Sequence, residues 1–271
     1  MITLRLLKSG GKDFNLKVTR YTNSQNPLSD RDFHANDDVQ VRLQNASFNT
    51  KLWYEKRREE FRGNIPEGIR VIPNFVFANA YLAYERQAPV TVFKNNTVTK
   101  EMGKDLLFLS HEEHPNGLYE WVFNDNTRFE AMLCSMYLLD LLASLTLHGD
   151  FEKVLRTPLI HHLALFKVIF SQYVEKKYPY VPPVNKKVKE LVEKGELATL
   201  LKVFKFIDIK LKEVLEASNQ TAAFLTSENH YNMIKDRFAS MEISIEDIDN
   251  IPEVQRIDGN NGFFLGGYGS M

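Results

Sequence analysis

Three side-chain amides stand close together in the segment TNSQNP. They are Asn23, Gln25 and Asn26, and Pro27 follows them directly. Each amide offers two N–H donors and an acceptor oxygen, so the three could hold a phosphate, a base edge or a neighbouring backbone. They could equally cap the next helix and brace the turn at Pro27. Residue type alone leaves both roles open.

A second candidate stretch, WYEKRREEF, combines cations with aromatic rings. Lys56, Arg57 and Arg58 directly follow Trp53, Tyr54 and a glutamate, which is a mixture suited to phosphates and unstacked bases. Its three glutamates partly cancel the positive charge, so a solvated segment with internal ion pairs is the alternative. If the stretch is a strand, alternation predicts a cationic face with Tyr54, Lys56 and Arg58, and an ion-paired opposite face.

Two histidine-containing motifs are weaker candidates. HEEH (111–114) is followed by Pro, Asn and Gly, which predicts a surface loop and not a helical zinc motif, so we expect no metal site. Arg156 and His161 match the Arg-x4-His spacing of HEPN-type ribonucleases that occur in phage defence. The chain's histidines make one such match expected by chance, and Pro158 fits poorly inside a helix.

The composition is that of an ordinary globular protein. The chain has 271 residues, 44% of them hydrophobic, and a formal net charge of -1, which excludes a globally basic nucleic-acid binder. The charge is uneven, because residues 1–72 carry 13 Lys and Arg against 9 Asp and Glu. The single cysteine, Cys134, excludes an internal disulfide and lies in an apolar segment, so we expect an inert buried thiol in a cytoplasmic protein.

The elements that must position these residues fall into two parts. Residues 1–20 alternate apolar and polar side chains around a KSGG turn and predict a β-hairpin. Ser29 and Asp32 have the spacing of a capping box, a short helix is expected over 36–48, and 51–61 favours a strand. Apolar positions at helical spacing predict the remaining helices over 74–86, 127–148, 158–177, 184–194 and 196–217.

These patterns predict a mainly α protein of the α+β class. A small β-hairpin and helix element over 1–72 should pack on a larger helical domain over 73–258, followed by a Gly-rich and aromatic tail over 259–271. The most apolar helix, 127–147, should lie at the centre of the core. It carries Glu130 and Asp140, so a buried helix is favoured over a membrane span.

The segment TNSQNPLSDRDFHANDDVQVRLQ, followed by WYEKRREEF, closely resembles the abortive-infection phage-resistance (AIPR) family. Proteins of that family carry Thr-Asn-Ser-Gln-Asn-Pro, then an Asn-Asp pair and a Gln, then a Tyr-Glu block with three basic residues. The resemblance is dense over residues 16–62, and FANAYLAYERQAPVTVF and GLYEWVF resemble its weaker downstream pattern. The family commonly has a glycine after the basic residues, where this chain has Glu59.

The resemblance implies a module of a bacterial anti-phage defence protein that contacts nucleic acid or nucleotide through residues 22–62. The residues that it implies for this contact are Asn23, Gln25, Asn26, Tyr54, Lys56, Arg57 and Arg58. A more distant resemblance links the amides to the Asn-x-Gln step of ParB-like nucleotide-binding domains. In those domains the step follows a phosphate-binding turn that this chain lacks.

Two alternatives stay open. Family members typically carry an upstream Asn-Gly-Gly-Gln-Thr segment, so this sequence resembles the C-terminal half of the family. The chain could therefore be a non-catalytic interaction module that docks onto a partner carrying the other half, with residues 1–20 pairing with that partner or with a second copy in a homodimer. The second alternative is a ribonuclease that uses Arg156 and His161. The residues do not identify a cofactor.

Overall fold

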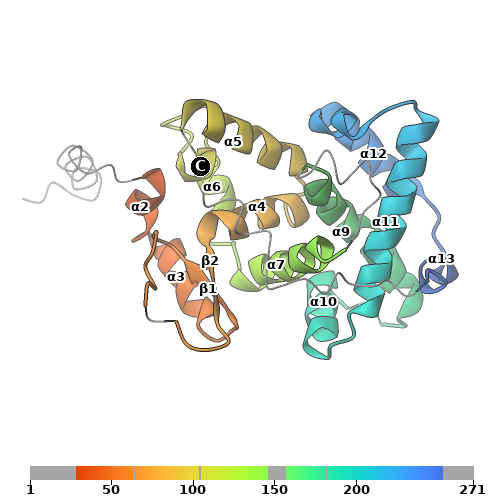
Figure 1. Ribbon diagram of the computed structural model, residues 1–271, viewed down its shortest axis with the longest axis horizontal. Coiled ribbons are helices and arrows are strands. Elements are labelled where there is room, and N and C mark those ends of the chain that lie inside the picture. The colour runs from red at the N-terminus through yellow and green to blue at the C-terminus, as the bar shows by residue number, and fades with distance from the viewer. Residues whose placement is uncertain (1–28, 64, 104, 146–156, 181, 253–271) are drawn as a thin grey trace, which may run out of the picture.

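The computed structural model describes residues 29–252, except residues 64, 104, 146–156 and 181 (Figure 1). This part of the chain is mainly α-helical with a small two-stranded sheet, which confirms the predicted fold class. The first elements are α2 (Asp30–His34), α3 (Asp38–Ser47), β1 (Leu52–Glu55) and β2 (Arg70–Pro73). They lie together at one end of the molecule (Figure 1). The hairpin predicted over 1–20 and the tail over 259–271 lie outside the described residues.

Helices make up most of the remaining described chain. They are α4 (Asn74–Tyr84), α5 (Pro89–Met102), η1 (Leu106–Phe108), α6 (Tyr119–Val122), α7 (Phe129–Ala143), α9 (Thr157–Lys177), α10 (Val184–Glu193), α11 (Ala198–Ala217), η2 (Ala222–Thr226), α12 (Glu228–Ser240) and α13 (Ile245–Asp249). All five predicted helices of this region are confirmed, with ends that differ by a few residues. Pro158 is the second residue of α9, close to the start that the sequence predicted for this helix.

The core is centred on α4, α7 and α9, which pack against one another. Leu138, Leu142 and Leu145 of the α7 region are buried and Leu139 is half-buried, which confirms that this segment belongs to the core. The apolar cluster continues without a break into the small element, where it includes Tyr54. The small element therefore packs directly on the helices. Among the described helices, none has both the length and the apolar character that crossing a membrane requires.

The two strands form a parallel pair, with Leu52 opposite Arg70 and Glu55 opposite Pro73. Parallel neighbours need a long crossover connection, and residues 56–69 supply it. The strand predicted over 51–61 is thus confirmed only for Leu52–Glu55. The alternation expected beyond Glu55 is wrong, because the chain turns there.

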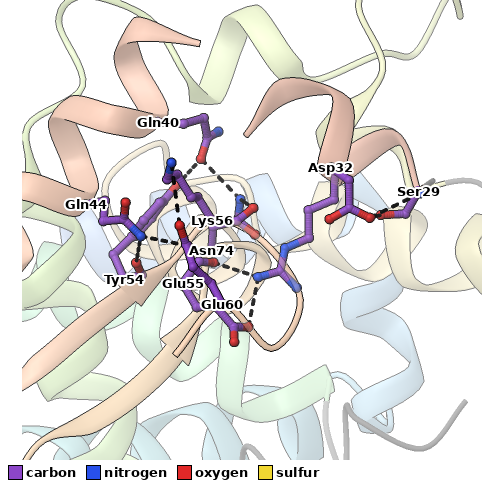
Figure 2. A network of polar contacts seen from close by, with 10 residues as sticks. Ser29, Asp32, Gln40, Gln44, Tyr54, Glu55, Lys56, Glu60 and Asn74 are labelled. Carbon is purple, nitrogen blue, oxygen red and sulfur yellow. Dashed lines mark hydrogen bonds and ion pairs between the residues drawn. The ribbon is translucent and has the colours of Figure 1, made fainter. Parts of the chain in front are cut away.

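Two short helices precede the first strand, whereas a single helix over 36–48 was expected. The capping pair at the start of α2 is present: the Asp32 carboxylate accepts from the Ser29 backbone N–H at 3.3 Å and from its hydroxyl at 2.7 Å (Figure 2). This pairing satisfies a backbone donor at the start of α2. A second helix, α3, begins after the connection through Asn36 and Asp37. It lies against β1.

Candidate nucleic-acid interface

The two segments that carry the family resemblance face each other in the fold. Side chains from α2, α3 and their connection contact β1 and the turn after it. Side-chain pairs join Arg31 to Glu55, Asn36 to Arg57, Gln40 to Tyr54, and Gln44 to Glu60. The polar residues of α2, α3 and their connection are therefore spaced so that they hold β1 and the turn after it against these helices.

The most deeply buried of these contacts is centred on Gln40 (Figure 2). Its side-chain oxygen accepts from the Tyr54 hydroxyl at 2.7 Å and from the Asn74 amide at 3.1 Å. All three residues are fully buried. Burial raises the pKa of Tyr54 well above its usual value, so the hydroxyl stays protonated and keeps donating. This triad joins α3, β1 and α4.

A second group of contacts holds the turn after β1. The Gln44 amide donates to the Glu60 carboxylate at 2.7 Å and to the Tyr54 carbonyl at 3.3 Å. The Lys56 ammonium lies 3.5 Å from the same Glu60 carboxylate, and only 12% of the Lys56 side chain is exposed. The charge of Lys56 is therefore neutralised within the turn (Figure 2).

Polar contacts join the end of β1 to α2, and the α2–α3 connection to α6. Arg31 donates to the Glu55 carbonyl at 2.6 Å and to its carboxylate at 3.0 Å. The Asp37 carboxylate accepts from the Tyr119 hydroxyl at 2.7 Å and lies 2.8 Å from His34 Nδ1. Tyr119 belongs to the GLYEWVF segment of the downstream resemblance, so that segment contacts the upstream one.

Arg57 and Arg58, in the turn after β1, differ from the other cations of this region in exposure and pairing. Arg57 is exposed, and one of its N–H groups donates to the neutral Asn36 amide oxygen at 2.5 Å. Arg58 is also exposed and forms no ion pair with any described residue. Arg62, by contrast, pairs with Glu59 at 3.0 Å. Arg57 and Arg58 therefore keep most of their donors and their full charge available to a ligand.

Glu59, the residue after Arg58, has a φ of +58°, in the left-handed region. Side chains with a Cβ adopt this region at an energetic cost that glycine avoids. A glycine would adopt this conformation without that cost, and in this chain a glutamate adopts it.

The structure separates the predicted contact residues into three groups. Asn23, Gln25 and Asn26 lie outside the described residues. Tyr54 is fully buried, so its ring cannot stack on a base at the surface, and the expected cationic face with Tyr54, Lys56 and Arg58 does not form. Lys56 is half-buried, and among the predicted contact residues that the structure describes, Arg57 and Arg58 are the exposed ones.

The described histidines of the two motifs do not form the catalytic or metal sites for which they were considered. Arg156 lies outside the described residues, and His161 is fully buried with its Nε2 2.9 Å from the Leu225 carbonyl. A catalytic base must reach the proton that it removes, and this imidazole is enclosed by protein. The HEEH segment forms turns, as expected, and His111 lines a cavity of about 580 Å³ beside α5 and Trp121. Within the described ranges, no three His, Cys, Asp or Glu side chains gather to hold a metal ion.

Sequence reasoning missed several residues of this network, including Asn74, Gln40, Gln44 and Tyr119. Asn74 had a usable signal, because it is a lone polar residue between RVIP and the apolar segment FVFANAYLAY. Gln40 and Gln44 share one helical face and so could have been paired with a buried partner. The identity of that partner depends on the tertiary fold.

The comparisons with known proteins identify the family. The model of the family described as AIPR protein matches residues 1–236. This range covers most of the 271 residues, so the chain belongs to the AIPR family. Family membership indicates a role in abortive-infection phage defence. No curated protein and no solved structure matched the chain.

Proposed function

We propose that this chain is a module of a phage-defence protein that contacts the phosphates of nucleic acid or nucleotide through residues 22–62, with Arg57 and Arg58 as the main contacts. The observation that supports the proposal is the state of these two arginines. Both are exposed at the tip of the turn after β1, and neither is neutralised by a carboxylate of the described residues.

The other cations near these two arginines are already paired with carboxylates. Arg31, Lys56 and Arg62 each pair with a glutamate of β1 or of the turn after it. A guanidinium that keeps its N–H donors can hold a phosphate by two parallel hydrogen bonds, which an already paired cation cannot do as well. The contacts of Gln44 and Glu60 hold the turn in place, so little ordering of the turn is required when a ligand binds.

The test is a salt titration of nucleic-acid binding, followed by fluorescence polarisation of a labelled oligonucleotide. The variant Arg57→Ala/Arg58→Ala is compared with Arg128→Ala/Arg237→Ala, which removes the same charge from two exposed arginines, one just before α7 and one in α12. Each lost phosphate contact should reduce the slope of log K against log salt by about 0.7 for a single strand and about 0.9 for a duplex. We expect the first variant to bind weakly with a smaller slope, and the control to bind like the parent.

Two results would overturn the proposal. One is binding that does not depend on salt concentration, because phosphate contacts release counterions. The other is an equal loss of affinity in both double variants, which would show a general charge effect without a defined site.

The interaction-module alternative depends on residues 1–20, which lie outside the described residues, and it stays a prediction. The ribonuclease alternative gains no support, because the His161 imidazole is buried against a backbone carbonyl.

A further inference from the structure

Three aromatic side chains form a partly exposed cluster beside the proposed phosphate contacts. Phe48 packs edge-on against Trp53 with ring centroids 5.0 Å apart, and Phe61 lies 5.3 Å from Trp53 and 6.0 Å from Phe48. Phe48 is 43% exposed, and Trp53 and Phe61 are half-buried. These three residues are called the aromatic patch below. Its rings come from the end of α3, from β1 and from the turn after β1.

The strand explains why Trp53 faces outward. Leu52 and Tyr54 point into the core, so the residue between them lies on the opposite face of β1. Phe48 is the C-cap residue of α3 and continues this outer surface. Contiguous apolar side chains at a surface are a feature of interaction sites, and these three rings contact one another.

The charges around the aromatic patch favour nucleic acid as its ligand. Lys51 follows Phe48 by three residues, and Arg58 precedes Phe61 by three; both are exposed, and neither pairs with a carboxylate of the described chain. Arg62, beside Phe61, has a side chain that is 81% exposed but pairs with Glu59 at 3.0 Å, so the unpaired cations near the patch in sequence are, among the described residues, Lys51 and Arg58. Cations next to stackable rings are the combination that proteins use for single strands, whose phosphates and base faces are both accessible. In a duplex the base faces are already stacked on one another, so the aromatic rings could not stack on them and would add little to the affinity.

We propose that the aromatic patch stacks unpaired bases, and that the module therefore binds single-stranded nucleic acid in preference to duplex. This inference rests on the proposed function, because Arg57 and Arg58 supply the phosphate contacts. The base-stacking rings are Phe48, Trp53 and Phe61, and the buried Tyr54 takes no part.

The experiment compares one labelled oligothymidylate of about twelve nucleotides with its duplex at the same salt concentration, a length within the range that such sites cover. The variant Phe48→Leu keeps the apolar bulk and removes the aromatic face, so the fold should be preserved; urea unfolding checks this. Tyr180→Leu is the matched control, because Tyr180 is 90% exposed and lies in the α9–α10 connection. We expect tighter binding of the single strand by the parent, and an affinity loss of about tenfold for Phe48→Leu with the single strand only.

Tryptophan fluorescence gives an independent readout. The chain has two tryptophans, Trp53 and Trp121, so Trp121→Phe leaves Trp53 as the sole reporter in the aromatic patch. Stacking of bases on the patch should quench its emission, and the duplex should quench it less.

The outcomes separate this inference from the proposed function. If Arg57→Ala/Arg58→Ala weakens binding but Phe48→Leu does not, or if duplex binds as tightly as single strand, the stacking inference fails and the phosphate contact stands. If the parent binds neither form, both fail. If Phe48→Leu instead removes a copurifying protein and leaves oligonucleotide binding unchanged, the patch is a protein interface and the inference is overturned.

Discussion

Replacing Tyr54 by phenylalanine should reduce stability and leave ligand binding unchanged. The substitution removes a buried hydroxyl that donates to the Gln40 oxygen at 2.7 Å. That oxygen keeps its contact with the Asn74 amide at 3.1 Å, so no acceptor is left without a partner. The loss should therefore be that of one net hydrogen bond, about 1 kcal/mol. Gln40→Ala should cost more, about 2–4 kcal/mol, because it removes the shared acceptor of two buried donors and leaves a cavity.

The assay is urea unfolding of the parent and both variants, with oligonucleotide affinity measured on the folded proteins. Tyr180→Phe serves as the control, because its hydroxyl belongs to a side chain that is 90% exposed, and its stability should match that of the parent. The reasoning is refuted if Tyr54→Phe is as stable as the parent. It is also refuted if this variant loses affinity without losing stability, since Tyr54 would then contact the ligand directly.

Three further predictions follow from single residues. Glu59→Gly should be more stable than Glu59→Ala by about 1 kcal/mol in urea unfolding, because φ is +58° there; a more stable alanine variant would contradict the left-handed turn. Burial raises the pKa of Asp105 above 3.8, so the parent loses stability as pH rises through the folded-state pKa. Asp105→Asn lacks this loss, so its stability relative to the parent should increase as pH rises above about 4; a difference that does not change with pH would contradict the raised pKa. Cys134 is buried and burial raises its pKa to about 12, so iodoacetamide at about pH 8 should label it only after unfolding, and rapid labelling of the folded protein would show that it is accessible.

The helices could be predicted from the sequence because their apolar residues repeat at helical spacing over long stretches. In α7 and α11 apolar residues extend over most of the helix, and an apolar segment of that length is compatible with few structures other than a buried helix. The small element lacks such a signal. Strand β1 has four residues, and its parallel partner β2 begins only after the long crossover connection, so the pairing depends on contacts that are distant in sequence.

The candidate site was predicted in part. The stretch with Arg57 and Arg58 was correctly identified as a cationic segment, but its alternation could not show which face is buried, since a period of two defines two faces without orienting them. Tyr54 was therefore assigned to the wrong face, and Lys56 was misplaced because the strand ends at Glu55. The turn after Glu55 is held by Gln44 and Glu60, and this contact joins two segments whose interaction sequence patterns alone do not reveal.

The most direct test of the central claim is photo-crosslinking of the whole chain to an oligonucleotide that carries a photoreactive base, followed by mass spectrometry of the crosslinked peptides. We expect the crosslinks to fall within residues 22–62, mainly in peptides that include the turn with Arg57 and Arg58. Crosslinks confined to other parts of the chain, such as α11 or α12, would contradict the account.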